Sequence, residues 1–130
     1  MEDIKKQLKK AGFTGEMDDS AVAKDFYSHD ASMFELRPQI VVHPHDTHDV
    51  EALVKFVNKH KKKHPELSLT ARAAGTDMAG GAINESIIVG FMEHMNSIGH
   101  VTLTEATAQP GVYYRDFEKH TLQHGGLMPT

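Results

Sequence analysis

The sequence has no cysteine, no tryptophan and no long apolar run. Without cysteine the chain can form neither disulfides nor thiolate zinc sites, and it has no cysteine nucleophile. No segment approaches the roughly 20 apolar residues that span a bilayer, and residues 1–13 lack the apolar core of a secretory signal. These absences favour a cytoplasmic protein, free or peripheral to a membrane, with no transmembrane segment.

The sequence also has no excess of basic residues. It contains 14 Lys and Arg and 18 Asp and Glu, which gives a net charge of −4. Nucleic-acid binders are expected to carry a basic surface, so no nucleic-acid partner is predicted. The basic run "KHKKKH" at 59–64 follows a helical pattern. Cations suit the carbonyl-rich end of a helix, so we interpret this run as a solvated helix terminus.

What is present fits one soluble domain: 130 residues, of which 39% are hydrophobic and 25% charged. Apolar periodicity, caps and breakers predict helices at 3–12, 18–30, 46–63 and 113–126, and extended segments at 40–42, 66–73, 86–91 and 100–111. A strand, helix and strand between residues 40 and 72 predict a parallel crossover. The expected fold class is α+β, with a small, mostly parallel sheet flanked by helices.

The segment "ARAAGTDMAGGA" at 71–82 is the most distinctive motif of the chain. It lacks the Lys and Ser/Thr that complete a P-loop, and it lacks the G-x-G-x-x-G pattern of a Rossmann fold. Two interpretations remain. Consecutive small residues let backbone N–H groups turn inward to bind an anion, with the Thr76 hydroxyl as a further donor. Alternatively, the glycines only permit a tight connection between strands.

Four segments resemble, in order, the N-terminal part of the FAD-binding (PCMH-type) domain of FAD-linked oxidases, the vanillyl-alcohol-oxidase-like superfamily. The branch of D-lactate and glycolate dehydrogenases is the most similar. The segments are "YSHDASMFELRPQIVVHPHDTHDVEALVKFVNKH", "ARAAGTDMAGGA", "IIVGFMEHMNSI" and "ATAQPGVYYRDFEKHTLQHGGLMP". The resemblance divides the chain into a helical lead-in at 1–29 and an incomplete FAD-binding domain at 30–130.

The resemblance implies FAD as cofactor and places its pyrophosphate on the backbone amides of the loop. The implied cofactor-binding residues are Ala73, Ala74, Gly75, Thr76, Asp77, Gly80, Pro44 and Gly111, of which Gly80 shapes the loop and Pro44 and Gly111 line the adenine side. Relatives often have glycine where Ala73 and Ala74 stand, so we predict a negative φ at both positions. Asp77 is expected to turn away from the phosphates. No histidine lies between 72 and 82, so the resemblance implies noncovalent FAD.

Ten histidines raise the alternative of a metal-binding domain, with His43, His45 and His48 close together and His60 one helical turn from His64. No carboxylate at a suitable spacing completes a ligand set, so no metal site is predicted. A second alternative is a module of the same fold that binds no flavin, suggested by Ala73, Ala74 and Asp77.

As part of a longer enzyme, the resemblance implies oxidation of a 2-hydroxy acid such as D-lactate or glycolate. The catalytic residues stay unknown, because in relatives they lie beyond the matched segment, and the 130-residue chain alone is expected to be inactive. The abrupt ending after a helix is interpreted as truncation. We therefore expect apolar surface to be exposed and to mediate self-association.

Overall fold

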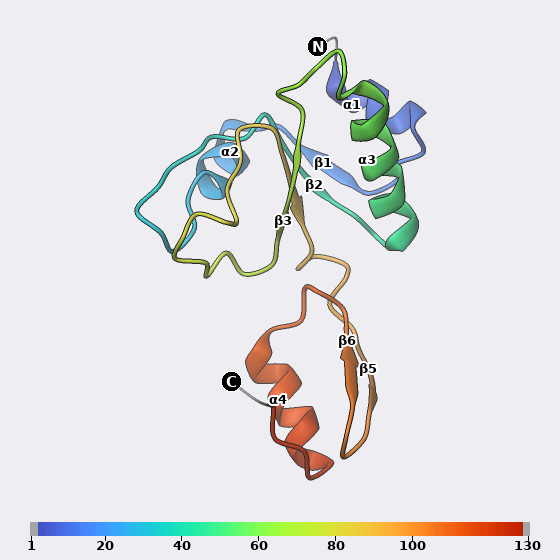
Figure 1. Cartoon of the computed structure of the whole chain (residues 1–130), viewed down its shortest axis with the longest axis vertical. Helices are drawn as coiled ribbons and strands as arrows, with labels where there is room; N and C mark the ends of the chain where they lie inside the picture. The colour runs from blue at the N-terminus through green and yellow to red at the C-terminus, as the bar shows by residue number, and fades with distance from the viewer. Residues whose placement is uncertain (1–2, 129–130) are drawn as a thin grey trace.

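The computed structural model describes residues 3–128, so the outermost residues of the expected ranges 1–29 and 30–130 lie outside it. Its centre is a four-stranded sheet in the order β1-β2-β4-β3 (Figure 1). The strands are β1 (Glu16–Asp18), β2 (Ile40–His43), β3 (Leu69–Arg72) and β4 (Ile87–Gly90). Strands β2, β4 and β3 are mutually parallel, and β1 joins β2 antiparallel. The expected α+β class and mostly parallel sheet are confirmed.

Four helices surround this sheet and a separate hairpin. They are α1 (Ile4–Lys10), α2 (Ala21–Tyr27), α3 (Thr47–His60) and α4 (Tyr114–Gln123). Helix α3 begins where the sequence predicts, because the Asp46 side chain accepts a hydrogen bond from the Asp49 N–H at 3.0 Å. Ser20 caps α2 in the same way through the Ala23 N–H.

The core lies between the sheet and the pair α1 and α3, which pack together on one side (Figure 1). Alternate residues of the central strands face it, and it consists of Leu8, Phe13, Ile40, Val42, Ala52, Leu53, Phe56, Leu67, Ile87 and Val89. The intervening residues Val41 and Ile88 are buried too, and α2 contacts β2. Burial on both faces explains why β2 and β4 are continuous apolar runs.

Two elements differ from the sequence-based expectation. Strand β1 was not expected, because two of its three residues are acidic and give no strand signal. Its backbone is extended because it pairs with β2. The alternating segment 100–111 is not one strand but part of an antiparallel hairpin, β5 (Ile98–Val101) and β6 (Ala106–Ala108). The Thr102 hydroxyl accepts hydrogen bonds from the N–H groups of Thr104 and Glu105, which closes the turn.

A buried carboxylate joins three segments near the N-terminus of α3. Asp49 is fully buried and accepts hydrogen bonds from the Thr14 N–H at 2.7 Å and the His45 N–H at 2.9 Å. The Thr14 hydroxyl also donates to it at 3.0 Å. Burial alone would raise the pKa of Asp49, but these hydrogen bonds outweigh burial and hold the pKa below its ordinary value.

We expect Asp49→Asn to lower the free energy of unfolding by about 2 kcal/mol, because an amide can no longer accept from every one of these donors. Urea denaturation of the two proteins measures the difference. Glu51→Gln is a matched control on the same helix, because Glu51 pairs with Lys55 at the surface. It should leave stability nearly unchanged, and an equal loss in both variants would contradict the role given to Asp49.

Several large apolar side chains are exposed. Met33 is 92% exposed and Met78 is 82% exposed, and Val22, Leu103 and Leu127 are also exposed. Self-association through such surface stays a prediction, which sedimentation tests. Among residues 3–128, no helix has both the length and the apolar character needed to cross a bilayer.

Candidate cofactor-binding site

The small-residue loop follows β3, at the edge of the sheet where the carboxyl ends of the three parallel strands meet. Ligands of α/β sheets gather at this kind of edge. The loop uses positive φ only at its glycines, +68° at Gly75 and +82° at Gly80. Ala73 and Ala74 have no positive φ, so the expectation for both alanines is confirmed.

The loop offers free backbone donors. Within the part of the chain that the structure describes, the N–H groups of residues 73–77 donate no hydrogen bond. Most of these residues are exposed, so solvent satisfies the N–H groups in the absence of a ligand. Successive unpaired N–H groups with small side chains are the arrangement that binds phosphate oxygens.

Arg72 lies beneath this loop rather than pointing to solvent. Its side chain is buried, with Arg72 6% exposed, and Nη1 donates to the His29 carbonyl at 2.6 Å. The guanidinium also stacks on the Tyr27 ring, 4.9 Å from its centroid. Burial lowers the pKa of Arg72, yet an arginine stays protonated in a protein. Arg72 therefore ties the loop to the segment after α2.

The carboxylate of Asp77 is turned onto its own loop. Oδ1 accepts hydrogen bonds from the Ala79 N–H at 2.6 Å and the Gly81 N–H at 3.0 Å. These contacts brace residues 77–81 as a compact turn. The loop itself therefore occupies the Oδ1 atom of Asp77, and the orientation of this carboxylate relative to a bound phosphate stays a prediction.

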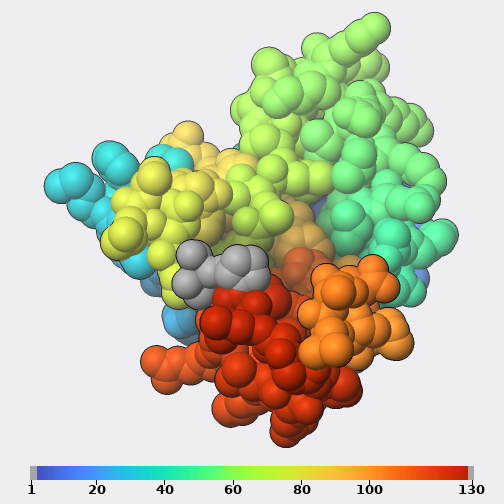
Figure 2. Space-filling view, turned by 60° about the horizontal axis from the view of Figure 1, so that its bottom comes forward, coloured from blue at the N-terminus to red at the C-terminus, as the bar shows by residue number. Residues whose placement is uncertain are grey.

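A cavity of about 350 Å³ lies between this loop and the beginning of α4. Figure 2 shows α4 in red below the yellow surface of the loop. The cavity is lined by Ala73, Ala74, Thr76, Met92, Gly111, Val112, Tyr113, Tyr114 and Arg115. A smaller cavity of about 190 Å³ shares Met92, Gly111, Val112 and Tyr113 with it. Four of the expected residues, Ala73, Ala74, Thr76 and Gly111, thus line one space.

Gly111 fixes the far wall of this cavity by a close backbone approach. Its N–H donates to the Met95 carbonyl at 2.9 Å, and a Cβ on Gly111 would lie 2.2 Å from the Phe91 carbonyl oxygen. No side chain fits at that distance. The N–H of Phe91 in turn donates to the Arg72 carbonyl at 3.0 Å. The turn at 110–112 is therefore docked directly on the strand ends that carry the loop.

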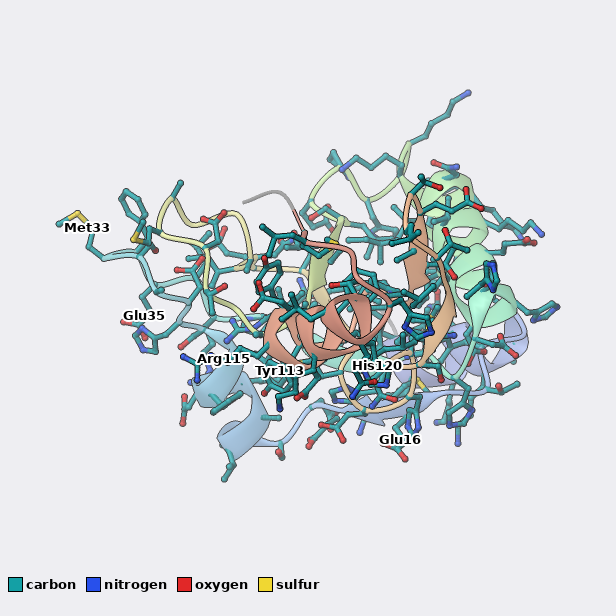
Figure 3. The ribbon with its side chains drawn as sticks, turned by 90° about the horizontal axis from the view of Figure 1, so that it is seen from below. Glu16, Met33, Glu35, Tyr113, Arg115 and His120 are labelled. Atoms are coloured by element: carbon teal, nitrogen blue, oxygen red, sulfur yellow. The ribbon has the colours of Figure 1, made fainter. Side chains whose placement is uncertain are left out.

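The lining suits a nucleotide with a pyrophosphate. It contains the Arg115 cation and the Thr76 hydroxyl, and no carboxylate is among its residues. Tyr113, 56% exposed, adds an aromatic ring on which a planar group can stack. Figure 3 shows Tyr113 and Arg115 at the start of α4. Sequence analysis did not select these two residues or Tyr114; their place directly after the Pro110-Gly111-Val112 turn was the available signal.

Four of the expected residues do not line this cavity, and Asp77, described above, is one of them. Gly75 packs on the Arg72 guanidinium, where its Cβ position is 2.6 Å from Nη2. Gly80 lines a different cavity, of about 300 Å³, beside Phe34. Pro44 is fully buried after β2. A role of Gly75, Gly80 and Pro44 in cofactor binding stays a prediction.

The largest of these cavities, about 550 Å³, lies elsewhere, between α1 and α3. It is lined by Gln7, Lys10, Ala11, Lys55, Phe56, Lys59 and His60. Its lysines lie on exposed helix surfaces and it includes no part of the loop. Size alone therefore does not decide the site, and the free backbone donors favour the cavity at the loop.

Proteins similar in sequence include a domain family and several enzymes. The sequence model of a family described as "FAD binding domain" matches residues 38–130. D-2-hydroxyglutarate dehydrogenase of Escherichia coli (strain K12) is 35% identical over 92 residues, which are 71% of this chain and 9% of that protein. Glycolate oxidase subunit GlcD of Bacillus subtilis (strain 168) is 29% identical, over 98% of this chain and 27% of that protein.

Solved structures share the fold. An alkyldihydroxyacetonephosphate synthase superimposes with a TM-score of 0.73 at 19% identity, over 95% of this chain and 26% of that one. The chain spans less than a third of the length of each of these proteins. The family match covers more than half of the chain. The chain belongs to the FAD binding domain family, and its cofactor is FAD.

Proposed function

We propose that the loop at 73–77 binds the FAD pyrophosphate noncovalently, and that the cavity beside it holds part of the dinucleotide. The observation that carries this proposal is the run of backbone N–H groups at 73–77 that have no hydrogen-bond partner among the described residues. The cavity beside these groups is also lined by Arg115 and by no carboxylate. Neither histidine nor cysteine is among the lining residues, which supports noncovalent binding.

The substrate we propose for the whole enzyme is a 2-hydroxy acid. The D-2-hydroxyglutarate dehydrogenases and the glycolate oxidase subunit, by their names, act on acids with a hydroxyl next to the carboxylate. Bound FAD supplies the redox chemistry, accepting the two electrons of the oxidised C–H bond, while the protein binds and orients both partners. The residues described here would hold the cofactor, and we assign no catalytic residue to this segment.

The alternative of a module that binds no flavin rested on Ala73, Ala74 and Asp77. The backbone geometry argues against this alternative, since neither alanine has a positive φ and Asp77 bonds to its own loop. All three positions are therefore compatible with a bound pyrophosphate.

A titration with three ligands tests the proposal. FAD is added to the purified chain and binding is followed by flavin fluorescence, with riboflavin and ADP as comparisons. Saturable binding of FAD, competition by ADP and much weaker binding of riboflavin are expected, because only FAD and ADP carry a pyrophosphate. Equal affinity for riboflavin and FAD would contradict a pyrophosphate-centred site. Turnover of D-lactate, glycolate and D-2-hydroxyglutarate with a dye acceptor tests the substrate class on the whole enzyme.

Arg115→Ala should weaken FAD binding about tenfold, because among residues 3–128 it removes the one arginine or lysine of the cavity lining while leaving the loop intact. The FAD titration measures the change. Arg37→Ala is the matched control, since Arg37 is half-exposed, pairs with Asp25 and does not line the cavity. Equal loss of affinity in both variants would indicate a general effect of charge and would contradict the role of Arg115.

A further inference from the structure

We propose that Glu16, His45 and His94 form a binding site for a divalent transition-metal ion of the zinc class. One potential ligand atom from each of these residues lies within 4.8 Å of the others. Two imidazoles and one carboxylate form a common ligand set for zinc, with a fourth position open for water. None of the three residues lines the cavity proposed for FAD.

Sheet topology brings these residues together from distant parts of the sequence. Glu16 opens β1 and pairs with His43 at the end of β2. His45 follows β2 by two residues, and His94 follows the parallel strand β4. The ends of β2 and β4 lie side by side, with β1 at the outer edge of β2. Figure 3 shows Glu16 well separated from Tyr113 and Arg115.

The spacing of the ligand atoms is close to that of a metal site. His94 Nε2 and Glu16 Oε1 are 3.4 Å apart. Nitrogen and oxygen ligands at about 2.0–2.1 Å from zinc in a tetrahedron are separated by about 3.4 Å. The rings of His45 and His94 meet edge to face with centroids 4.5 Å apart. The His45 side chain is 45% exposed, so its ring has room to rotate onto a shared ion.

The Nε2 atom of His94 is buried and makes no hydrogen bond to the described residues, although the Glu16 carboxylate lies 3.4 Å from it. Buried polar nitrogens are nearly always satisfied, and ligation would satisfy this one. His43 Nδ1 is the other such atom; it faces Gly90, and His43 is not part of the cluster of potential ligand atoms.

Asp49 lies beside His45, close to the site. Its Oδ2 atom accepts the His45 backbone N–H at 2.9 Å. The same Oδ2 atom lies 3.9 Å from His45 Nδ1, beyond hydrogen-bond distance. Asp49 is itself held by Thr14, so it fixes the backbone of His45 next to the site.

Calorimetric titration of the untagged, metal-free chain with zinc chloride tests the proposal. One zinc ion per chain is expected, with Kd in the micromolar range or tighter. His94→Ala and Glu16→Gln should each weaken binding by about 100-fold, because each removes one of three ligands. Circular dichroism checks that both variants fold, and the visible absorption of bound Co²⁺ reports tetrahedral ligation in the parent chain.

His120→Ala is the matched control. His120 lies in α4 and His124 is the residue that ends this helix, one turn later; both are exposed, so they form a rival zinc-binding pair. The proposal predicts that His120→Ala keeps the affinity of the parent chain. Absence of stoichiometric zinc binding, or a loss in His120→Ala with full affinity in His94→Ala, would overturn it.

Discussion

Gly75→Val is expected to weaken FAD binding at least 100-fold. Gly75 has φ of +68°, a region that costs a β-branched residue about 2 kcal/mol or more. A Cβ there would lie 2.6–2.8 Å from three atoms of the Arg72 guanidinium, which is held by carbonyl groups and cannot simply swing away. The loop must shift, which displaces the N–H groups proposed to bind the pyrophosphate. Titration with FAD measures the loss.

Gly12→Val separates this effect from the general cost of a side chain at positive φ. Gly12 has φ of +92° in the turn after α1, and a Cβ there would meet nothing within 4 Å. The control variant should lose stability from backbone strain but keep the FAD affinity of the parent chain. Parent-like FAD affinity in Gly75→Val would show that the loop conformation does not matter for binding.

Arg72→Met is expected to lower the free energy of unfolding by about 3 kcal/mol. The substitution leaves the His29 carbonyl without its donor at 2.6 Å and removes the cation from the Tyr27 ring. FAD binding should weaken as well, since the loop loses its support from below. Urea denaturation and FAD titration on the same samples measure both effects.

Arg72→Lys distinguishes a structural arginine from one that binds phosphate. Lysine keeps the charge but has no planar fork to donate to carbonyls while stacking on Tyr27. We expect Arg72→Lys to be nearly as unstable as Arg72→Met. A lysine variant with parent-like stability and only a loss of FAD affinity would instead place Arg72 on the phosphates.

The parts of the fold predictable from sequence are those with local signals. Strands β2 and β4 were predictable from the β-branched run at 40–42 and the apolar run at 87–89. Helix α3 was predictable from its cap at Asp46. Strand β1 has no such signal, because Glu16 and Asp18 are exposed and only pairing with β2 makes the segment extended.

The candidate site likewise has a part that local sequence signals predict and a part that depends on contacts between distant residues. Small residues and glycines identify the loop, and the negative φ at Ala73 and Ala74 follows from the steric cost of the alternative. The contributions of Arg115 and Tyr113 depend on the docking of the turn at 110–112 against Phe91, a contact between distant residues. The triad of Glu16, His45 and His94 likewise joins three strand ends that sequence spacing keeps apart.

The most direct test of a pyrophosphate cradle is to record backbone amide chemical shifts of the isotope-labelled chain during titration with FAD. The N–H groups of residues 73–77 should shift most, followed by those at 111–115, since these segments face one cavity. Ligand-induced shifts concentrated instead at Lys10, Lys55 and Lys59 would place FAD in the cleft between α1 and α3 and contradict the account.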